Sequence, residues 1–424
     1  MPPLDVLKDI RDLKVVNVFK KKINFPIFAA MITFIIILVA ASVVLLDYLF
    51  YRRTISGWGC RFARMVAVAA LAVTDTLPVI SLLIFKCLLS DISQTAMTVG
   101  MWMQTLYFLT VLPRIAFYAG FLPIRNRRIG LTVGTVLCAA VLSILLVSIL
   151  HTRKNIEVKE CELKFASLPA AFDGYRIAFF SDLHVGSMLN PEKEICNVVD
   201  RINGLHPDLV IFGGDLVNIR HTELSDDVKR ILGGIDAPDG VVSVMGNHDT
   251  GIYIKDTIAL PRAENMRMVE TAMKDMGWTP LRDSTVYVAR GCDSISVTGL
   301  DFTDALLEYR HSFSVSEEYD TKPIFADVPD SVFNVTVSHM PQLWRNITDA
   351  NHGNLTLAGH VHATQIKFEC EDIRISPAML MYKEWSGLYG EGEHRLYIND
   401  GVGNVGFYMR IGARPEITLL KLRN

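Results

Sequence analysis

The chain has 424 residues, of which half are hydrophobic and only 21% are charged. This length suffices for two or three domains, and the composition excludes a disordered chain, a collagen-like repeat and a small disulfide scaffold. Residues 1–150 hold 15 Lys and Arg against 6 Asp and Glu, whereas residues 151–424 hold 27 against 39 and contain all 11 histidines. The acidic second part disfavours nucleic acid as a partner, and we expect any metal or acid–base chemistry there.

Four apolar stretches occur in the first 150 residues, and each is long enough to cross about 30 Å of hydrocarbon. They lie at about 25–50, 65–85, 96–120 and 129–150. We expect helices, because backbone groups in lipid must be satisfied within the segment. Residues 1–150 are therefore predicted to be a four-helix transmembrane region, in preference to a cleaved signal peptide or buried core helices. Residues 151–174 are expected to link this region to a second domain over residues 175–424.

The distribution of basic residues favours one orientation of this region. The loop over residues 51–64 carries four arginines and the loop over residues 121–128 carries three, while the middle loop has no Lys or Arg after Lys86. The positive-inside rule places the two basic loops in the cytoplasm and both chain ends outside it. Lys20 to Lys22, Arg153 and Lys154 argue the other way. We expect a multi-pass membrane protein with an extracytoplasmic second domain.

Asp75 lies within the second apolar stretch, between Thr74 and Thr76. A carboxylate at membrane depth is unfavourable unless it meets a partner or water. Two interpretations stay open: a contact with a proton or a substrate, or a packing hydrogen bond with the threonines. A transporter would require more polar groups inside the membrane than this one.

From Tyr175 onward, short apolar runs alternate with amphipathic ones. Six runs read as buried strands, at Tyr175–Phe180, Asp208–Phe212, Val241–Met245, Ser294–Thr298, Phe333–Val337 and Asn354–Ala358. Three amphipathic stretches predict helices, at Pro191–Asn203, Glu223–Leu232 and Arg262–Met276. This alternation is typical of an α/β or layered α+β fold.

Side chains that bind metals follow five of these strands. The motifs are Ser181-Asp182-Leu183-His184, Gly213-Gly214-Asp215-Leu216-Val217-Asn218, Gly246-Asn247-His248-Asp249, Ser338-His339 and Gly359-His360-Val361-His362. Each motif alone is weak evidence, since a D-x-H or H-x-H pair is usually solvated. Five motifs in order at strand ends, each with a glycine or serine that allows close backbone approach, predict one metal site. The other histidines, at positions 151, 206, 221, 311, 352 and 394, lack such partners and are expected at the surface.

In this order, the motifs resemble those of the calcineurin-like metallophosphoesterase superfamily: D-x-H, G-D-x-x-[DN], G-N-H-[DE], H and G-H-x-H. The resemblance covers about Tyr175 to His362. It implies a metal site above a two-sheet β sandwich flanked by helices, and hydrolysis of a phosphate mono- or diester. The later stretches Trp385–Tyr389, Leu396–Gly403 and Arg414–Ile417 resemble the branch with membrane-attached, often extracytoplasmic, catalytic domains.

The resemblance also implies the role of each side chain. Asp182, His184 and His362 would hold one metal ion, Asn247, His339 and His360 the other, and Asp215 would bridge both. Such mixed ligands suit Mn, Fe or Zn, and two ions about 3.5–4 Å apart can share a hydroxide that attacks phosphorus. His248 resembles the family's catalytic histidine, which contacts the phosphate or protonates the leaving group. Asp249 would either fix the ring of His248 or cap the following segment.

An apolar, aromatic segment follows the metal motifs, from Ala378 to Tyr382 and on through Trp385, Leu388 and Tyr389. It either enters the lipid headgroup region or forms a wall of the cleft or core. Together with the apolar helices, it suggests a membrane-held phosphoesterase whose substrate is a phospholipid-like or envelope-linked phosphoester. The alternative is a membrane sensor that binds metal and phosphate without catalysis. The complete ligand set and His248 favour the enzyme, with a phosphoester and the lipid bilayer as partners.

Overall fold

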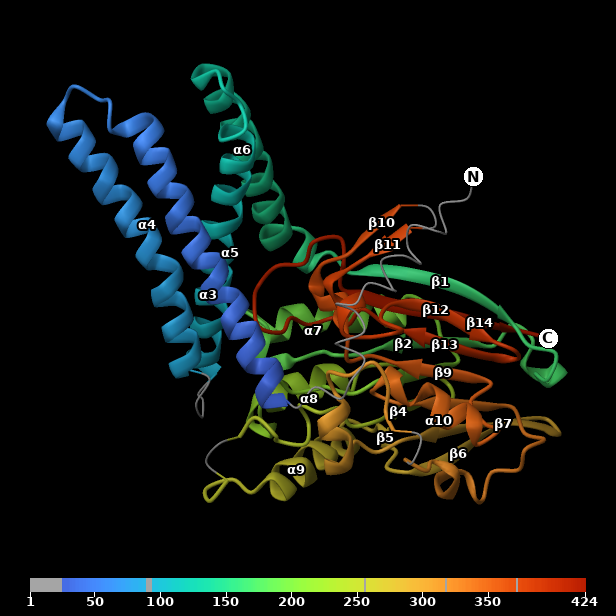
Figure 1. The fold of residues 1–424 in the computed structure, drawn as a ribbon. Helices are drawn as coiled ribbons and strands as arrows, with labels where there is room; N and C mark the ends of the chain where they lie inside the picture. Colours follow the sequence, from blue (N-terminus) through green and yellow to red (C-terminus); the bar gives the residue numbers. More distant parts are fainter. Residues whose placement is uncertain (1–24, 89–93, 255–256, 317–318, 371–372) are drawn as a thin grey trace, which may run out of the picture. The chain divides into compact units, whose positions relative to one another are not determined.

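The computed structural model describes residues 25–88, 94–254, 257–316, 319–370 and 373–424 (Figure 1). Residues 1–24, including Lys20 to Lys22 of the orientation argument, lie outside the described part. The described chain divides into two units that are not continuous in sequence. A helical unit comprises Phe25–Arg153 and Val405–Ile411, and a sheet unit comprises Lys154–Asn404 and Gly412–Asn424.

The helical unit contains α3 (Phe25–Phe50), α4 (Arg61–Leu88), α5 (Gln94–Phe121) and α6 (Arg127–Leu150) (Figure 1). The side chain of Asn126 begins α6 by accepting hydrogen bonds from the backbone N–H groups of Arg128 and Ile129. A Cβ at Gly134 of α6 would lie 2.7 Å from the carbonyl oxygen of Phe117. Glycine at this position therefore lets α5 and α6 approach closely.

Asp75 is part of an ion triad formed by three helices. The Nη1 atom of Arg114 in α5 lies 2.7 Å from Oδ1 of Asp75 in α4 and 2.9 Å from Oδ2 of Asp47 in α3. The same nitrogen is 3.3 Å from the Thr74 hydroxyl, and Tyr118 donates to Asp47. Asp75 therefore takes part in helix packing, as one interpretation held, but its partner is Arg114 and not Thr74 or Thr76.

The segment Val405–Ile411 packs within the helical unit, although it follows β13 in the sequence. The ring of Phe407 meets that of Phe108 of α5 at 5.1 Å, edge to face. The backbone N–H of Tyr408 donates to the Thr105 hydroxyl at 2.9 Å. Met409 is fully buried in a cluster with Leu145 and Ile149, both of α6.

Within the described residues, two helical stretches are long and apolar enough to cross a membrane, Arg61–Ser81 and Arg127–Lys154. All four predicted apolar stretches are helical, but a region of four membrane-crossing helices is not supported. In α5, Gln104, Thr105 and Arg114 interrupt the apolar sequence.

The sheet unit contains two six-stranded sheets (Figure 1). The first has the order β1 (Glu157–Lys164), β14 (Glu416–Arg423), β2 (Arg176–Phe180), β3 (Leu209–Phe212), β4 (Val241–Ser243), β5 (Thr279–Pro280). The second has the order β12 (Gly387–Glu391), β13 (His394–Ile398), β9 (Leu355–Ala358), β8 (Asn334–Val337), β7 (Asp293–Gly299), β6 (Ser284–Arg290). β2, β3 and β4 are parallel to one another, and so are β7, β8 and β9. β10 (Phe368–Cys370) and β11 (Ile373–Ile375) form a separate antiparallel ribbon.

The core of the sheet unit explains why the strands read as continuous apolar runs. In β2, Ile177 and Phe179 belong to the apolar cluster between the two sheets, whereas Ala178 and Phe180 belong to the cluster under the helices. A strand buried on both faces has no polar alternation. The covering helices are α7 (Pro191–Asn203), α8 (Asp226–Leu232) and α9 (Arg262–Asp275) on the first sheet and α10 (Trp344–Asp349) on the second. The predicted α/β fold, with two sheets and flanking helices, is confirmed.

All six predicted strands and all three predicted helices are present, with ends that shift by at most three residues. The structure differs over residues 151–174, expected as a linker, because this stretch contains β1. Five of the eight residues of β1 are charged, and it pairs only with β14 at the edge of its sheet. An edge strand with charged side chains lacks the apolar pattern by which the other strands could be predicted.

Candidate metal centre

The seven predicted metal ligands lie at the carboxyl ends of five strands drawn from both sheets. Asp182 and His184 follow β2, Asp215 follows β3, Asn247 follows β4, His339 follows β8, and His360 and His362 follow β9. All are buried except His360, which is partly exposed. The two sheets therefore bring side chains separated by up to 180 positions to one edge of the sandwich.

The backbone is strained at most of these positions. Positive φ angles occur at Asp182 (55°), His184 (46°), Asp215 (60°), His360 (72°) and His362 (51°). Residues other than glycine rarely adopt this region, and each instance costs about 1–3 kcal/mol. Strain that is concentrated at the predicted ligands indicates that the fold holds these side chains in place for a function.

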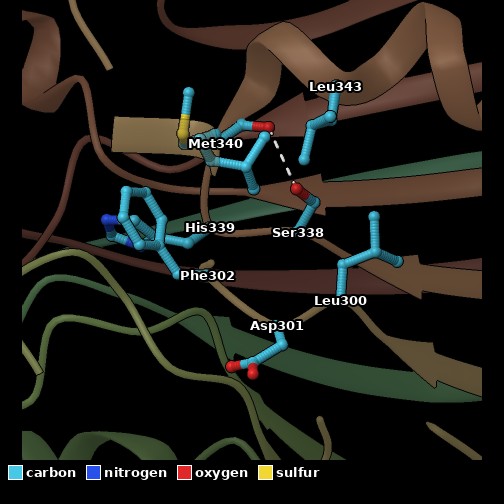
Figure 2. Close-up of a pocket in the computed structure, with 8 residues that line it drawn as sticks. Leu300, Asp301, Phe302, Ser338, His339, Met340 and Leu343 are labelled. Atoms are coloured by element: carbon cyan, nitrogen blue, oxygen red, sulfur yellow. Dashed lines mark hydrogen bonds between the residues drawn. The ribbon is translucent and has the colours of Figure 1, made fainter. Parts of the chain in front are cut away.

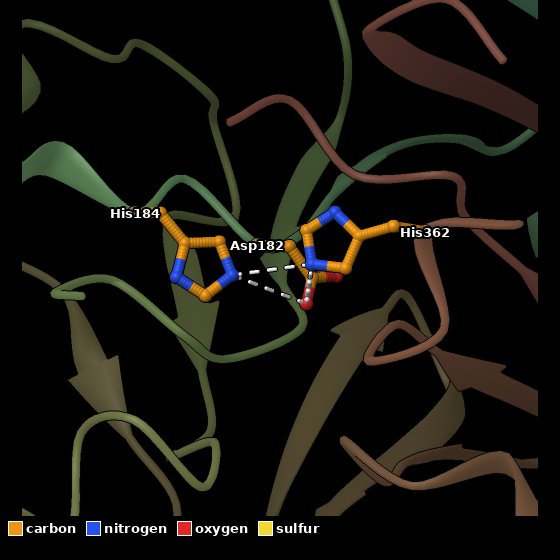
Figure 3. A group of neighbouring side chains, drawn as sticks. All are labelled: Asp182, His184 and His362. Atoms are coloured by element: carbon orange, nitrogen blue, oxygen red, sulfur yellow. Dashed lines mark hydrogen bonds and ion pairs between the residues drawn. The ribbon is translucent and has the colours of Figure 1, made fainter. Parts of the chain in front are cut away.

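Three of the ligands form a first group, which we call the Asp182 group (Figure 3). Nε2 of His362 lies 3.0 Å from Oδ1 of Asp182 and 3.1 Å from Nε2 of His184. Nε2 of His184 lies 3.9 Å from the same carboxylate oxygen. Two imidazole nitrogens and a carboxylate oxygen thus face one point, which is the arrangement that a cation requires.

The second group, which we call the Asn247 group, is joined to the first through Asp215. Oδ1 of Asn247 lies 2.8 Å from Nδ1 of His360 and 3.2 Å from Nε2 of His339. Oδ2 of Asp215 lies 3.2 Å from that His339 nitrogen and 3.7 Å from Nε2 of His184 in the Asp182 group. Asp215 therefore has the position expected of a carboxylate shared by two groups.

Two glycines allow the backbone to approach the carboxylates. A Cβ at Gly246 would lie 2.1 Å from Oδ1 of Asp215, and a Cβ at Gly359 would lie 2.3 Å from Oδ2 of Asp182. Any larger residue would displace a ligand. The glycines of the motifs are thus explained by close approach of the backbone.

The protonation states of the site suit metal binding. Burial would raise the pKa of Asp182 and of Asp215, but His362 and His339 respectively outweigh it, so both carboxyl pKa values are lowered. Burial lowers the pKa of His184 well below its usual value and that of His360 to about 4. Burial also acts on His339, but Asp215 reverses the effect and raises its pKa to about 9. At neutral pH the carboxylates are ionised, and a cation would displace the proton of His339.

His248 is oriented by a different partner from the one that we predicted. Its Nδ1 lies 2.6 Å from the carbonyl oxygen of Asn218, so this nitrogen carries a proton and donates it. Its backbone N–H donates to Oδ1 of Asp215 at 2.8 Å. The ring is thus fixed by a carbonyl group, and Nε2 is left for proton exchange.

Asp249 holds the loop that carries Asp215. Its carboxylate accepts hydrogen bonds from the backbone N–H groups of Asp215, Leu216, Val217 and Gly246 at 2.8–3.0 Å. Neither of the two roles expected from the sequence, fixing the His248 ring or capping the following segment, describes these contacts. Asp249 connects the second and third motifs through their backbones.

Several residues at the site could not be found from motifs. Asn247 donates from Nδ2 to the hydroxyl of Tyr253 at 3.3 Å, and the Tyr253 ring lies 4.3 Å from that of His248. The carbonyl oxygen of Arg310 lies 2.6 Å from Nε2 of His360 and accepts from the Tyr382 hydroxyl at 3.0 Å. Burial raises the pKa of Tyr253 to about 12, and the charge of Arg310 partly offsets this effect. Arg310 is thus a buried cation beside the Asn247 group.

Of the histidines expected at the surface, His352 is buried, and His311 is only partly exposed and contacts the site. Nδ1 of His311 lies 3.1 Å from the Tyr382 hydroxyl, and the His311 ring stacks on the His360 ring with centroids 6.2 Å apart. His352 is buried and stacks on Phe325 at 4.6 Å. Both lie in or beside the long segment between β7 and β9, whose folding back on the sheet no local pattern predicts.

An apolar pocket lies beside His339 (Figure 2). It is lined by Leu300, Asp301, Phe302, Leu306, Ser338, His339, Met340 and Leu343. The Phe302 ring meets the His339 ring edge to face at 6.4 Å. The imidazole itself is oriented by its Nδ1, which lies 2.8 Å from the carbonyl oxygen of Gly213.

The apolar segment after the motifs belongs mainly to the core. Ala378, Tyr382 and Trp385 are buried in one cluster with Val361 of the last motif and with Ala363, which follows that motif. Of the two interpretations of this segment, the wall or core is therefore confirmed for these side chains.

Residues 175–364 match the family model described as calcineurin-like phosphoesterase. This part of the chain belongs to that family, whose members are hydrolases that cleave phosphoester bonds with divalent metal ions. The chain is 29% identical over 273 residues to an uncharacterized metallophosphoesterase, YkuE, of Bacillus subtilis, a match covering 63% of this chain and 86% of the relative.

Two further relatives have more specific names. A zebrafish (Danio rerio) protein named transmembrane protein with metallophosphoesterase domain is 27% identical over 297 residues, covering 68% of this chain and 62% of the relative. The UDP-2,3-diacylglucosamine pyrophosphatase LpxG of Chlamydia trachomatis is 25% identical over 292 residues, covering 61% of this chain and 85% of the relative.

Proposed function

We propose that this chain is a membrane-held phosphoesterase that acts with two metal ions on a lipid- or envelope-linked phosphoester. The observation that carries the proposal is the shared position of Asp215 between the Asp182 group and the Asn247 group. Its Oδ2 atom lies 3.7 Å from His184 of one group and 3.2 Å from His339 of the other. Manganese, iron and zinc suit these imidazole, carboxylate and amide ligands.

Each side chain has a role in this proposal. Asp182, His184 and His362 would hold one ion, Asn247, His339 and His360 the second, and Asp215 both. When bound, two such ions neutralise charge on phosphate oxygens and lower the pKa of an attacking water. His248 would exchange a proton with the leaving oxygen through Nε2, because its Nδ1 proton is donated to Asn218.

Arg310 and Tyr253 would contact the substrate beside the Asn247 group. Arg310 comes from the segment between β7 and β8, and its guanidinium charge acts on the Tyr253 hydroxyl, which lies 3.3 Å from Nδ2 of Asn247. A buried guanidinium is a strong partner for phosphate oxygens. We assign to Arg310 a part in orienting the anionic substrate.

The membrane part of the proposal rests on the two candidate spans and on the names of relatives. The arginine-rich loops favour a sheet unit outside the cytoplasm only with four crossings, which the two candidate spans by themselves do not supply. The name of the LpxG relative, a pyrophosphatase of a diacylated sugar nucleotide, supports a lipid-linked substrate.

The test combines metal analysis with a substrate panel on the purified full chain. We expect bound transition metal, and faster turnover of phosphoester lipids in mixed micelles than of soluble nucleotides. Asp215→Asn should abolish turnover and lower metal content, while Asp226→Asn, on the exposed side of α8, should change neither. A wild-type protein that retains metal but hydrolyses none of the substrates would favour the sensor, and preference for soluble nucleotides would contradict the lipid substrate.

A further inference from the structure

The ribbon of β10 and β11 has one apolar and one charged face. Phe368 pairs with Ile375, Cys370 with Ile373, and Glu369 with Arg374. Cross-strand partners lie on the same face of a sheet, and neighbours along a strand alternate. The four apolar side chains therefore share one face, which we call the ribbon patch, and the two charged side chains share the other.

The charged face contacts the domain, although Glu369 is itself 48% exposed. Nη1 of Arg374 donates to the carbonyl oxygen of Ser386 at 2.8 Å, and the guanidinium lies over the Tyr389 ring. Oε2 of Glu369 is 3.4 Å from Nζ of Lys367, which is buried. This arrangement is the reverse of the usual one, in which the apolar face is the one that packs.

The ribbon patch is consequently exposed. Phe368 is 62% exposed, Ile375 45% and Ile373 43%, and Cys370 is exposed as well. Single exposed apolar residues are common, but four on one face of a two-stranded ribbon indicate a contact surface.

The base of the ribbon lies where the chain enters the sheet unit. A Cβ at Gly412, the first residue of the returning chain, would lie 1.8 Å from the carbonyl oxygen of Lys367, next to Phe368. The backbone N–H of Glu157 donates to the carbonyl oxygen of Pro415 at 2.7 Å. Only two residues separate Glu157 from Lys154, the end of the candidate span Arg127–Lys154, and three residue steps extend about 10 Å at most.

We propose that the ribbon patch inserts into the headgroup boundary of the bilayer that holds the helical unit. The proposal rests on the membrane attachment proposed for this chain: the chain passes from the candidate span into β1 within three residues, and Gly412, which returns from the helical unit, contacts Lys367 at the base of the ribbon. A phenylalanine and two isoleucines on a face without charge suit the boundary of headgroups and acyl chains. Glu369 and Arg374, on the opposite face, stay on the protein side.

The first test measures lipid contact directly and does not depend on activity. The full chain is prepared with six of its seven cysteines replaced by serine, so that Cys370 alone carries an environment-sensitive fluorophore. A matched protein carries the fluorophore at Cys292, which is exposed in the turn between β6 and β7. In nanodiscs that contain brominated phosphatidylcholine, we expect at least threefold stronger quenching at Cys370 than at Cys292.

Three outcomes would overturn the proposal. The first is equal quenching at the two positions, and the second is failure of the chain to incorporate into nanodiscs. The third is that, in detergent without lipid, the Cys370 fluorophore becomes more protected from solvent as the protein concentration rises. The last result would identify a second copy of the chain as the occupant of the patch.

The second test uses a variant with Phe368→Ser, Ile373→Ser and Ile375→Ser. We expect at least a tenfold lower kcat/KM for a phosphoester lipid in vesicles, through KM, and unchanged turnover of a soluble chromogenic phosphodiester. Equal loss on both substrates would contradict the proposal. If the wild-type protein cleaves neither substrate, the proposed function fails, and the quenching experiment still decides the ribbon patch.

Discussion

The carboxylate of Asp249 accepts the backbone N–H of Asp215 at 2.8 Å, so one buried acid positions another. The same carboxylate accepts the N–H of Gly246 at 2.9 Å, just before Asn247. The backbone of Asp215, the proposed shared ligand, and the backbone just before Asn247 are therefore held by a single side chain. We expect Asp249 to contribute to metal affinity as much as some of the predicted ligands do, because a ligand binds a metal ion well only when its position is fixed.

Asp249→Asn tests this support. Both carboxylate oxygens of Asp249 accept hydrogen bonds from backbone N–H groups. In asparagine an NH₂ group replaces one of these oxygens and cannot accept, so at least one buried N–H group loses its partner. We predict a loss of about 10- to 100-fold in metal affinity, with a parallel loss of turnover. Metal content after dialysis against a chelator series measures the affinity, and Asp226→Asn serves as the control. Unchanged affinity with reduced turnover would instead show that Asp249 acts on the substrate step.

His248→Gln separates proton transfer from metal binding. If His248 exchanges a proton with the leaving oxygen, its loss should lower kcat roughly 10²- to 10⁴-fold for a poor leaving group. The loss of kcat should be much smaller for a nitrophenyl phosphoester, because its nitrophenolate leaving group departs without a proton. Comparison of alkyl and nitrophenyl phosphoesters measures the difference, with metal content as the control. An equal loss for both leaving groups would assign His248 to phosphate binding.

His311 should make the metal-free protein sensitive to acid. Burial, with the nearby His360 and Arg310, lowers the pKa of His311 to about 3 from its usual value near 6.5. Between these pH values the unfolded chain binds a proton that the folded protein does not, so the stability falls as the pH decreases from 6.5 to 3. The effect amounts to about 1.4 kcal/mol per pH unit at most.

The measurement compares thermal unfolding of the wild type and of His311→Gln in EDTA at pH 7.5 and pH 5. The variant should lose less stability at pH 5, because the other buried histidines contribute equally to both proteins. Identical losses would show that His311 is protonated as readily in the folded state as in the unfolded state.

Arg114→Met should destabilise the helical unit. It leaves Asp47 and Asp75 without their shared cation, and breaking a buried ion pair typically costs about 3–5 kcal/mol. Thermal aggregation of the full chain in detergent measures the effect. The triple variant with Asp47→Asn and Asp75→Asn should recover part of the loss, because it removes the uncompensated charges. A triple variant that is less stable than Arg114→Met would contradict this account.

The sequence predicted the site best where a metal-binding side chain comes directly after a strand. Asp182 comes two residues after Phe180 and Asp215 three after Phe212, so predicting the strands also predicted where the side chains would meet. Arg310 and Tyr253 carry no such signal. Their positions depend on long loops that fold back over the sheet edge, and no local pattern encodes that path.

The helices show a related limit. Arg114 interrupts an apolar stretch and would normally be a reason against burial, yet it is stabilised by Asp47 and Asp75 from two other helices. The partners of a buried charge come from segments distant in sequence, so a single stretch cannot predict them.

The segment Val405–Ile411 limits how the protein can be divided for experiments. Phe407 and Met409 are seated among α5 and α6, although the residues on both sides of the segment belong to the sheet unit. A fragment that starts at Lys154 would carry these apolar side chains without the helices against which they pack, and we expect it to aggregate. To obtain a soluble form of the sheet unit, the seven residues Val405–Ile411 must therefore be replaced in addition to removing the amino-terminal helices.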